Sequence, residues 1–186
     1  MRGIISGSSG SGKTTVMSSI ILNHWTNYEH LYIFTKSLDQ PIYNDLIEIF
    51  EGIPEIETHF SDTDIISIDE CKPNSLIFID DWPLKDLNDV FEMFRRSRPK
   101  NISVFYLTQC YTTANLQNIR NNLSILILFK STHYVKKIWE DFLSNTISLN
   151  EFKTLCSTCW KNDYGFITID LKNNRFYYKL EKLIKN

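Results

Sequence analysis

Short apolar runs alternate with amphipathic segments along most of the chain. Runs such as His30–Thr35 and Ser75–Asp80 are apolar with little polar alternation, which is typical of strands buried on both faces of a parallel sheet. The stretches between these runs repeat hydrophobic residues at helical spacing. This order predicts an α/β fold in which a mostly parallel sheet is flanked by helices.

The pattern predicts elements along the whole chain and ends in a β-hairpin. In such a sheet, ligands bind at the carboxyl ends of the strands. The sequence KNNR separates the two hairpin strands. The expected strands are 3–6, 30–35, 56–60, 75–80, 102–107, 125–129, 166–170 and 176–180, and the expected helices are 13–24, 41–50, 84–96, 134–143 and 149–160.

Composition fits a globular protein with a single domain over residues 1–186. Hydrophobic residues make up 42% of the 186 positions, enough to build a sizeable core. The net charge of -2 excludes a uniformly basic nucleic-acid coat but leaves room for a local basic surface. No apolar run approaches the ~18 residues of a membrane helix. The four cysteines and the lack of a secretory signal lead us to expect free thiols and an intracellular location.

The segment GSSGSGKT, from Gly7 to Thr14, matches the P-loop pattern G-x-x-x-x-G-K-[ST]. Its glycines let backbone N–H groups turn toward phosphate oxygens, Lys13 places a cation on the β- and γ-phosphates, and the Thr14 hydroxyl is a Mg²⁺ ligand. The loop lies between an expected strand and an expected helix, which disfavours a plain Gly/Ser turn. The expected contacts to ATP are Ser8, Ser9, Gly10, Ser11, Gly12, Lys13, Thr14 and Thr15.

Two aspartates end the apolar run IFIDD. An acid at the tip of such a strand is the expected partner of the P-loop Mg²⁺, so we assign Asp80 to the metal together with Thr14. Asp81 could then act as the general base on the attacking water. The alternative is a pair of solvated aspartates in a turn, with Asp81 capping the next helix.

The run ISVFYLTQC poses a separate question, because a buried strand ends there on an uncharged amide, Gln109. If this strand lies between the P-loop strand and the Asp80 strand, its tip points at the γ-phosphate. An amide can donate to a phosphate oxygen and accept from water, so Gln109 could sense whether the γ-phosphate is present. A solvated glutamine at a strand end is the alternative, and the chemistry alone does not separate the two.

Taken together, these motifs resemble a known family. The P-loop, the strand ending in two acids, the strand ending in glutamine and the segment LQNIRNN occur in an order and spacing similar to the viral DNA-packaging ATPases of the FtsK/HerA superfamily. The segment FRRSRPKNISVFYLTQ resembles that family's arginine-rich stretch before the glutamine strand. The poxvirus-type branch, also found in large DNA viruses, virophages and related transposons, is the one indicated. The resemblance covers roughly residues 3–130.

The resemblance implies a RecA-like (ASCE) P-loop ATPase core that assembles into a ring, a pentamer or a hexamer. Such a ring hydrolyses ATP and moves double-stranded DNA into a capsid, with a capsid vertex protein as a possible partner and no membrane. It implies the sensor role for Gln109. It places the protein in the host cytoplasm or a viral factory, or with the virion.

The resemblance also implies an arginine that reaches the γ-phosphate of a neighbouring subunit. Arg98 and Arg120 are the candidates, with Arg96 behind them. The alternatives are a solvated basic helix end around Arg98 and, for Arg120, a surface turn or a salt bridge. The chain departs from the family at Pro99, where many members have histidine, and at Asp81, where many have glutamate.

Two rival functions stay open at this point. A P-loop nucleotide kinase carries a similar loop, but it needs an acceptor pocket and an arginine-rich lid, and no lid insertion is clear in this chain. A nucleotide-dependent assembly switch would bind ATP with little hydrolysis, which Asp81 in place of glutamate would suit. If the protein is a motor, we expect Lys and Arg side chains of the basic clusters at 95–100 and 172–185 to contact DNA phosphates.

Overall fold

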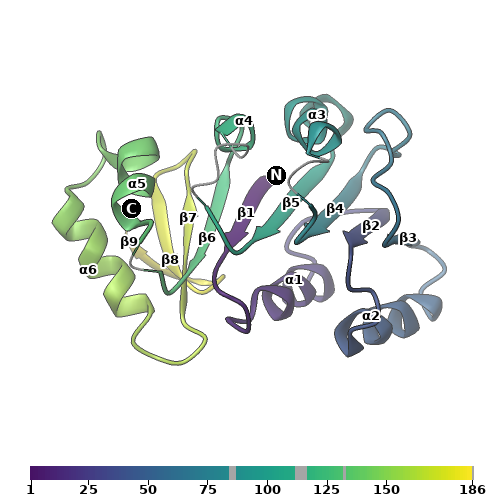
Figure 1. Ribbon diagram of the computed structural model, residues 1–186, viewed down its shortest axis with the longest axis horizontal. Helices are drawn as coiled ribbons and strands as arrows, with labels where there is room; N and C mark the ends of the chain where they lie inside the picture. Colours follow the sequence, from purple (N-terminus) through teal and green to yellow (C-terminus); the bar gives the residue numbers. More distant parts are fainter. Residues whose placement is uncertain (84–86, 112–116, 132, 186) are drawn as a thin grey trace.

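The computed structural model describes residues 1–83, 87–111, 117–131 and 133–185. Within these residues, nine strands form one sheet in the order β3-β2-β4-β5-β1-β6-β7-β8-β9 (Figure 1). The strands are β1 Arg2–Ser6, β2 His30–Thr35, β3 Glu57–Ser61, β4 Ser75–Asp80, β5 Ser103–Thr108, β6 Ile125–Phe129, β7 Phe166–Asp170, β8 Arg175–Tyr178 and β9 Lys182–Lys185.

The sheet is parallel from β3 to β6 and antiparallel from β6 to β9. The predicted α/β class and C-terminal hairpin are therefore confirmed. β5 pairs with β1 on one side and with β4 on the other, which confirms the strand order inferred from the chemistry of Gln109. β9 was not predicted, and it pairs with β8 through an irregular register at Phe176 and Tyr177.

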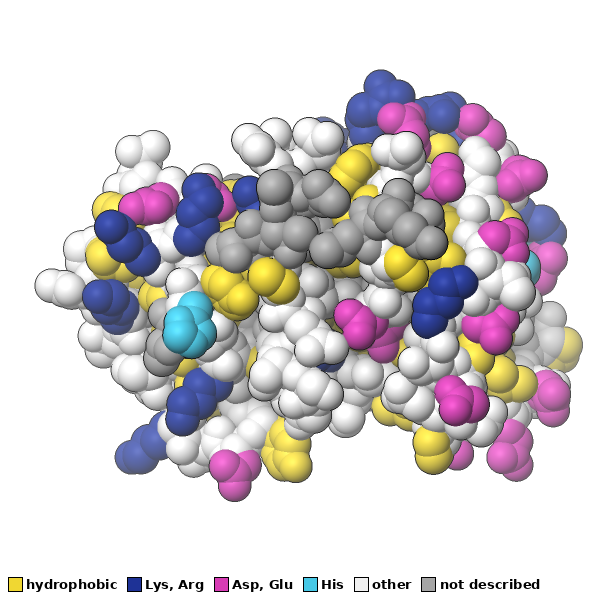
Figure 2. Space-filling view, in the orientation of Figure 1, with side chains coloured by type: hydrophobic (Ala, Val, Ile, Leu, Met, Phe, Trp, Pro, Cys, Tyr) yellow, Lys and Arg dark blue, Asp and Glu magenta, His cyan; other side chains and the backbone are white. Residues whose placement is uncertain are grey.

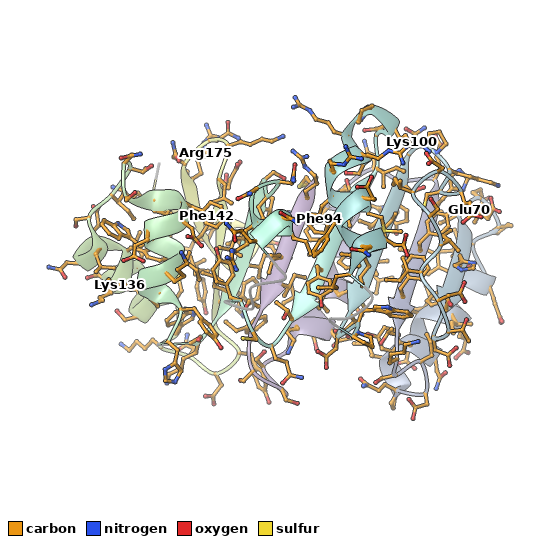
Figure 3. All side chains as sticks on the ribbon, turned by 45° about the horizontal axis from the view of Figure 1, so that its top comes forward. Glu70, Phe94, Lys100, Lys136, Phe142 and Arg175 are labelled. Atoms are coloured by element: carbon orange, nitrogen blue, oxygen red, sulfur yellow. The ribbon has the colours of Figure 1, made fainter. Side chains whose placement is uncertain are left out.

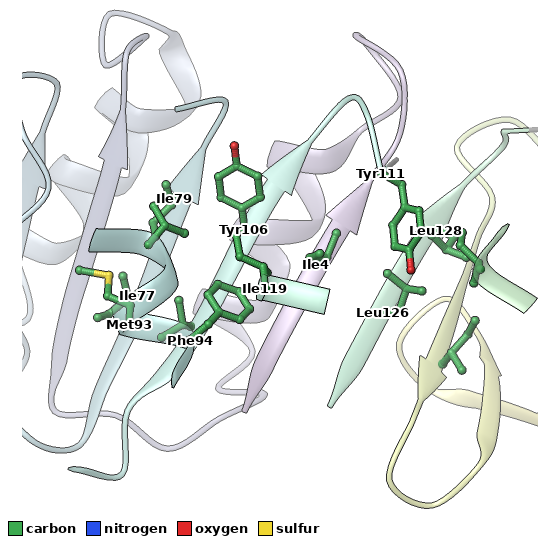
Figure 4. Packing of buried hydrophobic residues seen from close by; sticks show 14 of the residues in the cluster. Ile4, Ile77, Ile79, Met93, Phe94, Tyr106, Tyr111, Ile119, Leu126 and Leu128 are labelled. Atoms are coloured by element: carbon green, nitrogen blue, oxygen red, sulfur yellow. The ribbon is translucent and has the colours of Figure 1, made fainter. Parts of the chain in front are cut away.

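Alternate side chains of the central strands feed two separate cores. On β4, Ile77 and Ile79 pack in one cluster, while Leu76 and Phe78 pack in the other. The first cluster also includes side chains from α3 and α4, among them Phe94 and Ile119 (Figure 4). Burial on both faces explains why hydrophobic residues occupy successive positions along these strands, since neither face meets water.

Helices cover both faces of the sheet (Figure 1). α1 and α2 lie on one face, α3 and α4 lie on the other, and α5 and α6 pack with the C-terminal strands. Among the described residues, no helix combines the length and the hydrophobicity that crossing a bilayer requires. The bounds are α1 Lys13–Leu22, α2 Pro41–Glu51, α3 Asn88–Arg96, α4 Gln117–Arg120, α5 Val135–Ile138 and α6 Leu149–Cys159.

Some predicted helices differ from those in the structure. α1 stops at Leu22, before the predicted end, because His24 has a positive φ of 49° that a helix cannot contain. The expected helix 134–143 divides into α5 and a π-helical segment, Trp139–Leu143. The sequence did not predict this division, because hydrophobic spacing does not distinguish an α-helix from a π-helix over five residues. α4 was not predicted. The expected start of α3 at 84–86 falls outside the described residues.

Candidate functional site

The loop between β1 and α1 has the backbone geometry of a phosphate cradle. Gly10 and Gly12 adopt φ values of 72° and 98°, in the left-handed region that other residues avoid. A Cβ atom on Gly7 would lie 2.7 Å from the Cβ atom of Phe129 on β6, so this position also requires glycine. The loop leads directly into α1, which begins at Lys13. The N-terminus of a helix favours the binding of anions.

The Lys13 side chain folds back over this loop and is held by backbone carbonyl groups of the loop. The ammonium donates hydrogen bonds of 2.9 Å to the carbonyl oxygens of Gly7 and Ser8. Burial lowers the pKa of Lys13, and the nearby charges of Asp80 and Asp81 partly offset that effect. The loop therefore presents a cation where the phosphates of a bound nucleotide would lie.

Asp80 ends β4 beside the start of α1 and is 8% exposed. The Thr14 hydroxyl donates to Asp80 Oδ2 over 3.4 Å. Burial raises the pKa of Asp80, while hydrogen bonding from Tyr43 and the charge of Lys13 lower it. A hydroxyl and a buried carboxylate are oxygen donors of the kind Mg²⁺ prefers, and a cation there would offset the cost of burying the carboxylate. Thr14 and Asp80 therefore fit the metal that a P-loop requires.

Tyr43 on α2 completes this cluster, and sequence reasoning missed it. Its side chain is fully buried, and its hydroxyl donates a short hydrogen bond to Asp80 Oδ2. Burial and the charge of Asp80 raise the pKa of Tyr43, so the hydroxyl stays protonated and able to donate. In the sequence, Tyr43 shares the apolar face of α2 with Leu46 and Phe50, and this spacing indicates only a core position.

Asp81 and Gln109 meet at the ends of the neighbouring strands β4 and β5. Gln109 Nε2 donates to Asp81 Oδ2 over 3.1 Å, and both side chains are exposed. Asp81 has a positive φ of 49°, and its backbone N–H donates to the Leu107 carbonyl oxygen over 3.3 Å. Non-glycine residues in this conformation cluster at functional sites. The hydrogen-bond partner of the Gln109 amide is thus Asp81, the second of the two acids.

The candidate arginines lie in different environments. Arg120 is 9% exposed, with Nη1 3.0 Å from the Tyr111 carbonyl oxygen and Nε 3.6 Å from Asp141 Oδ2, so the salt-bridge alternative describes the structure. Arg96 forms two hydrogen bonds to Asp69. Arg98 is exposed in a 3-10 turn before β5, at the opposite end of that strand from Gln109. Arg98 therefore lies away from the end of β5 that carries Gln109.

Most of the basic cluster at 95–100 is paired with acids. Arg95 pairs with Glu92 on α3, and Arg96 pairs with Asp69. Lys100, labelled near the upper edge of Figure 3, donates to the Ile68 carbonyl oxygen over 2.8 Å. These pairings reduce the positive charge that this cluster presents to an anionic partner.

A cavity of about 1170 Å³ joins these groups along the carboxyl edge of the sheet. P-loop residues line it, and so do Asp80, Asp81 and Gln109 from the ends of β4 and β5. The first turn of α2 and a set of aromatic residues from β6 to β8 complete the walls. The volume is slightly above the roughly 300–1,000 Å³ typical of small-molecule sites. It offers room for more than a triphosphate group.

Solved structures share this fold across almost the whole chain. The genome packaging NTPase B204 from Sulfolobus turreted icosahedral virus 2, in complex with AMP, matches with a TM-score of 0.64 and 11% identity, covering 98% of both chains. B204 of Sulfolobus turreted icosahedral virus, described as a DNA-packaging ATPase, matches with a TM-score of 0.61 and 14% identity over 98% of this chain and 97% of that one.

A third match is to the monomer form of the pCW3 conjugation coupling protein TcpA with ATPγS, with a TM-score of 0.50 and 14% identity. It covers 98% of this chain and 58% of TcpA. No protein-family model matches the sequence, and the comparison with curated proteins finds no relative. At these identities the matches establish the fold, which is that of a P-loop NTPase.

We expect Tyr43→Phe to weaken Mg²⁺-dependent binding of a fluorescent ATP analogue by about 10-fold at neutral pH, as is typical when the partner of a metal-binding group is lost. Without the hydroxyl, the pKa of Asp80, already raised by burial, rises further. Because Mg²⁺ needs the ionised carboxylate, binding should fail at a higher pH in the variant than in the wild type as the pH falls. A Mg²⁺ titration at several pH values measures both effects.

Tyr28→Phe is the matched control, because Tyr28 is also buried but donates to the Ile21 carbonyl oxygen, outside the cavity. Its Mg²⁺ dependence should equal that of the wild type. An equal effect of the two substitutions would show that Tyr43 acts through packing and not through Asp80.

Proposed function

We propose that this chain is an ATPase that hydrolyses ATP and uses the energy to move double-stranded DNA into a viral capsid. The observation that carries the proposal is the position of β5 between β1 and β4. It places Gln109 beside Asp81, on the edge where Lys13, Thr14 and Asp80 also lie. This set matches the parts that phosphoryl transfer to water needs.

Each residue has a role in this reaction. The backbone N–H groups of residues 8–15 would bind the phosphates, and Lys13 would stabilise the charge on the β- and γ-phosphates. Thr14 and Asp80 would hold Mg²⁺, which when bound neutralises charge on the phosphate oxygens. Asp81 would orient a water molecule and accept its proton while the water oxygen bonds to the γ-phosphorus and the bond to the ADP oxygen breaks.

The packaging role has its own support. The match to B204 covers nearly all of both chains, so it includes the C-terminal strands as well as the nucleotide edge. Membership of the FtsK/HerA superfamily, and of its poxvirus-type branch, rests on the motif order in the sequence and is part of the proposal. The protein would then work inside the infected cell, in the cytoplasm or a viral factory, or with the virion.

DNA and a ring of identical subunits are the partners that this role requires, with a capsid vertex protein as a third. On the face shown in Figure 2, acidic side chains dominate the half that holds β2 and α2, while Lys and Arg are more frequent over the C-terminal half. A DNA backbone would meet less repulsion over the C-terminal half. Ring assembly would bring Arg98 of one subunit to the site of the next.

ATP turnover by the wild-type protein should rise more steeply than protein concentration and should increase further with linear double-stranded DNA at low salt. The first effect follows from a site completed between subunits, and the second from phosphate contacts that salt screens. A phosphate-release assay measures both, with Lys13→Ala as the inactive control. Flat turnover without a DNA response would favour an assembly switch, and phosphate transfer to a nucleoside monophosphate would identify a kinase.

Gln109→Ala should leave binding of the ATP analogue within about 3-fold of wild type, because Lys13 and the loop hold the phosphates. The same change should abolish most DNA translocation, measured by displacement of a third strand from a DNA triplex. Gln40→Ala is the control, since Gln40 at the start of α2 also lines the cavity but, among the described residues, forms no hydrogen bond with Asp81. Equal losses of binding and translocation in Gln109→Ala would refute the sensor role.

Arg98→Ala and Lys13→Ala should each be nearly inactive alone, with losses of about 1,000-fold expected for a missing arginine finger. A mixture of the two should regain turnover, because a Lys13→Ala subunit still supplies Arg98 to a neighbour with an intact P-loop. The measurement is phosphate release across mixing ratios. No recovery at any ratio would argue against an arginine acting between subunits.

A further inference from the structure

The cavity extends beyond the groups that the phosphates would occupy. Asp80, Asp81 and Gln109 lie on the β4 and β5 side of the P-loop, which is where the γ-phosphate would lie. The opposite side is formed by β6, β7 and β8, which continue the sheet away from β1 (Figure 1). A nucleotide whose γ-phosphate lies at the acids must extend its base toward these strands or out into solvent.

Four aromatic residues form this second side of the cavity, and we call them the aromatic wall: Phe129, Tyr164, Phe166 and Tyr178. The Phe129 and Phe166 rings pack with centroids 5.1 Å apart. A Cβ atom on Gly12 of the P-loop would lie 3.5 Å from Tyr164 Cδ1 and 3.6 Å from Phe129 Cε1. The aromatic wall therefore begins in contact with the phosphate loop.

Tyr164 is unusual within this wall because it is 69% exposed. It also has a positive φ of 57°, a conformation that costs a bulky residue free energy. The next residue is Gly165, where a Cβ atom would lie 2.1 Å from the Cys159 carbonyl oxygen at the end of α6. The tight turn after α6 therefore holds the tyrosine in place with its ring in solvent beside the P-loop.

The turn between β8 and β9 closes the far rim in a similar way. Lys179 lines the cavity and has a positive φ of 56°. Its backbone N–H donates to the Phe166 carbonyl oxygen over 3.0 Å, which fixes the turn to β7. Glu181 and Lys182 also line this rim, so polar groups surround the aromatic faces. An apolar face with a polar rim suits a flat heterocycle with hydrogen-bonding edges.

We propose that the aromatic wall is the base subsite for the nucleotide, with the ring of Tyr164 stacked on a purine. This proposal rests on the proposed function, because the phosphates must first lie on the P-loop. Stacking on an aromatic side chain tolerates any base, and a purine offers the larger face. The C-terminal strands, β7 to β9, thereby gain a binding role in addition to their structural one.

The test compares two ligands in calorimetry: a non-hydrolysable ATP analogue and inorganic tripolyphosphate, which has no base. Tyr164→Ala should weaken the ATP analogue by about 10-fold or more and leave tripolyphosphate unchanged. Tyr164→Phe keeps the stacking face and should bind both as the wild type does. The wild type should also prefer the ATP analogue to the matching UTP analogue, and Tyr164→Ala should lose that preference.

Tyr177→Ala is the matched control, since this half-buried tyrosine lies on β8 next to Tyr178 but does not line the cavity. Nucleotide binding by Tyr164→Ala equal to that of the wild type would overturn the base subsite and leave the P-loop site intact. A similar loss of both ligands would also overturn it, because the ring would then only support the loop. If the wild type bound neither ligand, the proposed function would fall first.

Discussion

β5 is hydrogen-bonded to β1 on one side and to β4 on the other, and this double pairing fixes where the polar strand ends meet. The register sets Thr108 opposite Ser6 and Leu107 opposite Asp80, so Gln109 emerges between the P-loop and the acids. Rigid strands hold these groups better than loops could, because each strand end is fixed by two ladders of hydrogen bonds. The two buried cores then hold the sheet from both faces.

The site also depends on a balance of buried charge. Lys13 and Asp80 are both largely removed from water, which disfavours the charged form of each. Loop carbonyls hold the ammonium, while hydroxyls from Thr14 and Tyr43 hold the carboxylate. Tyr43 thus ties α2 to the tip of β4. The balance leaves a cation and an anion ready for ligands of opposite charge.

The sequence predicted the parts of this molecule that local pattern controls. Strands β2, β4 and β6 have their predicted bounds because each contains at least four consecutive hydrophobic residues, and the P-loop motif located the phosphate cradle. β9 was missed because Lys182–Lys185 has lysine at both ends of four residues. The burial of Arg120 and the partner of Tyr43 were missed for another reason. Both depend on residues far away in the chain, and no local pattern encodes them.

The cavity joins segments that lie far apart in the sequence, since Lys13 and Lys182 both line it. β8 and β9 must therefore be in place before the pocket is complete. Strand pairings between such distant segments form slowly, because the entropy of closing a long loop is lost before the contacts between the strands can form. A ligand that contacted both segments would bind only the folded form and would stabilise it by mass action. Such a ligand would favour the complete sheet over forms from which β8 and β9 have detached.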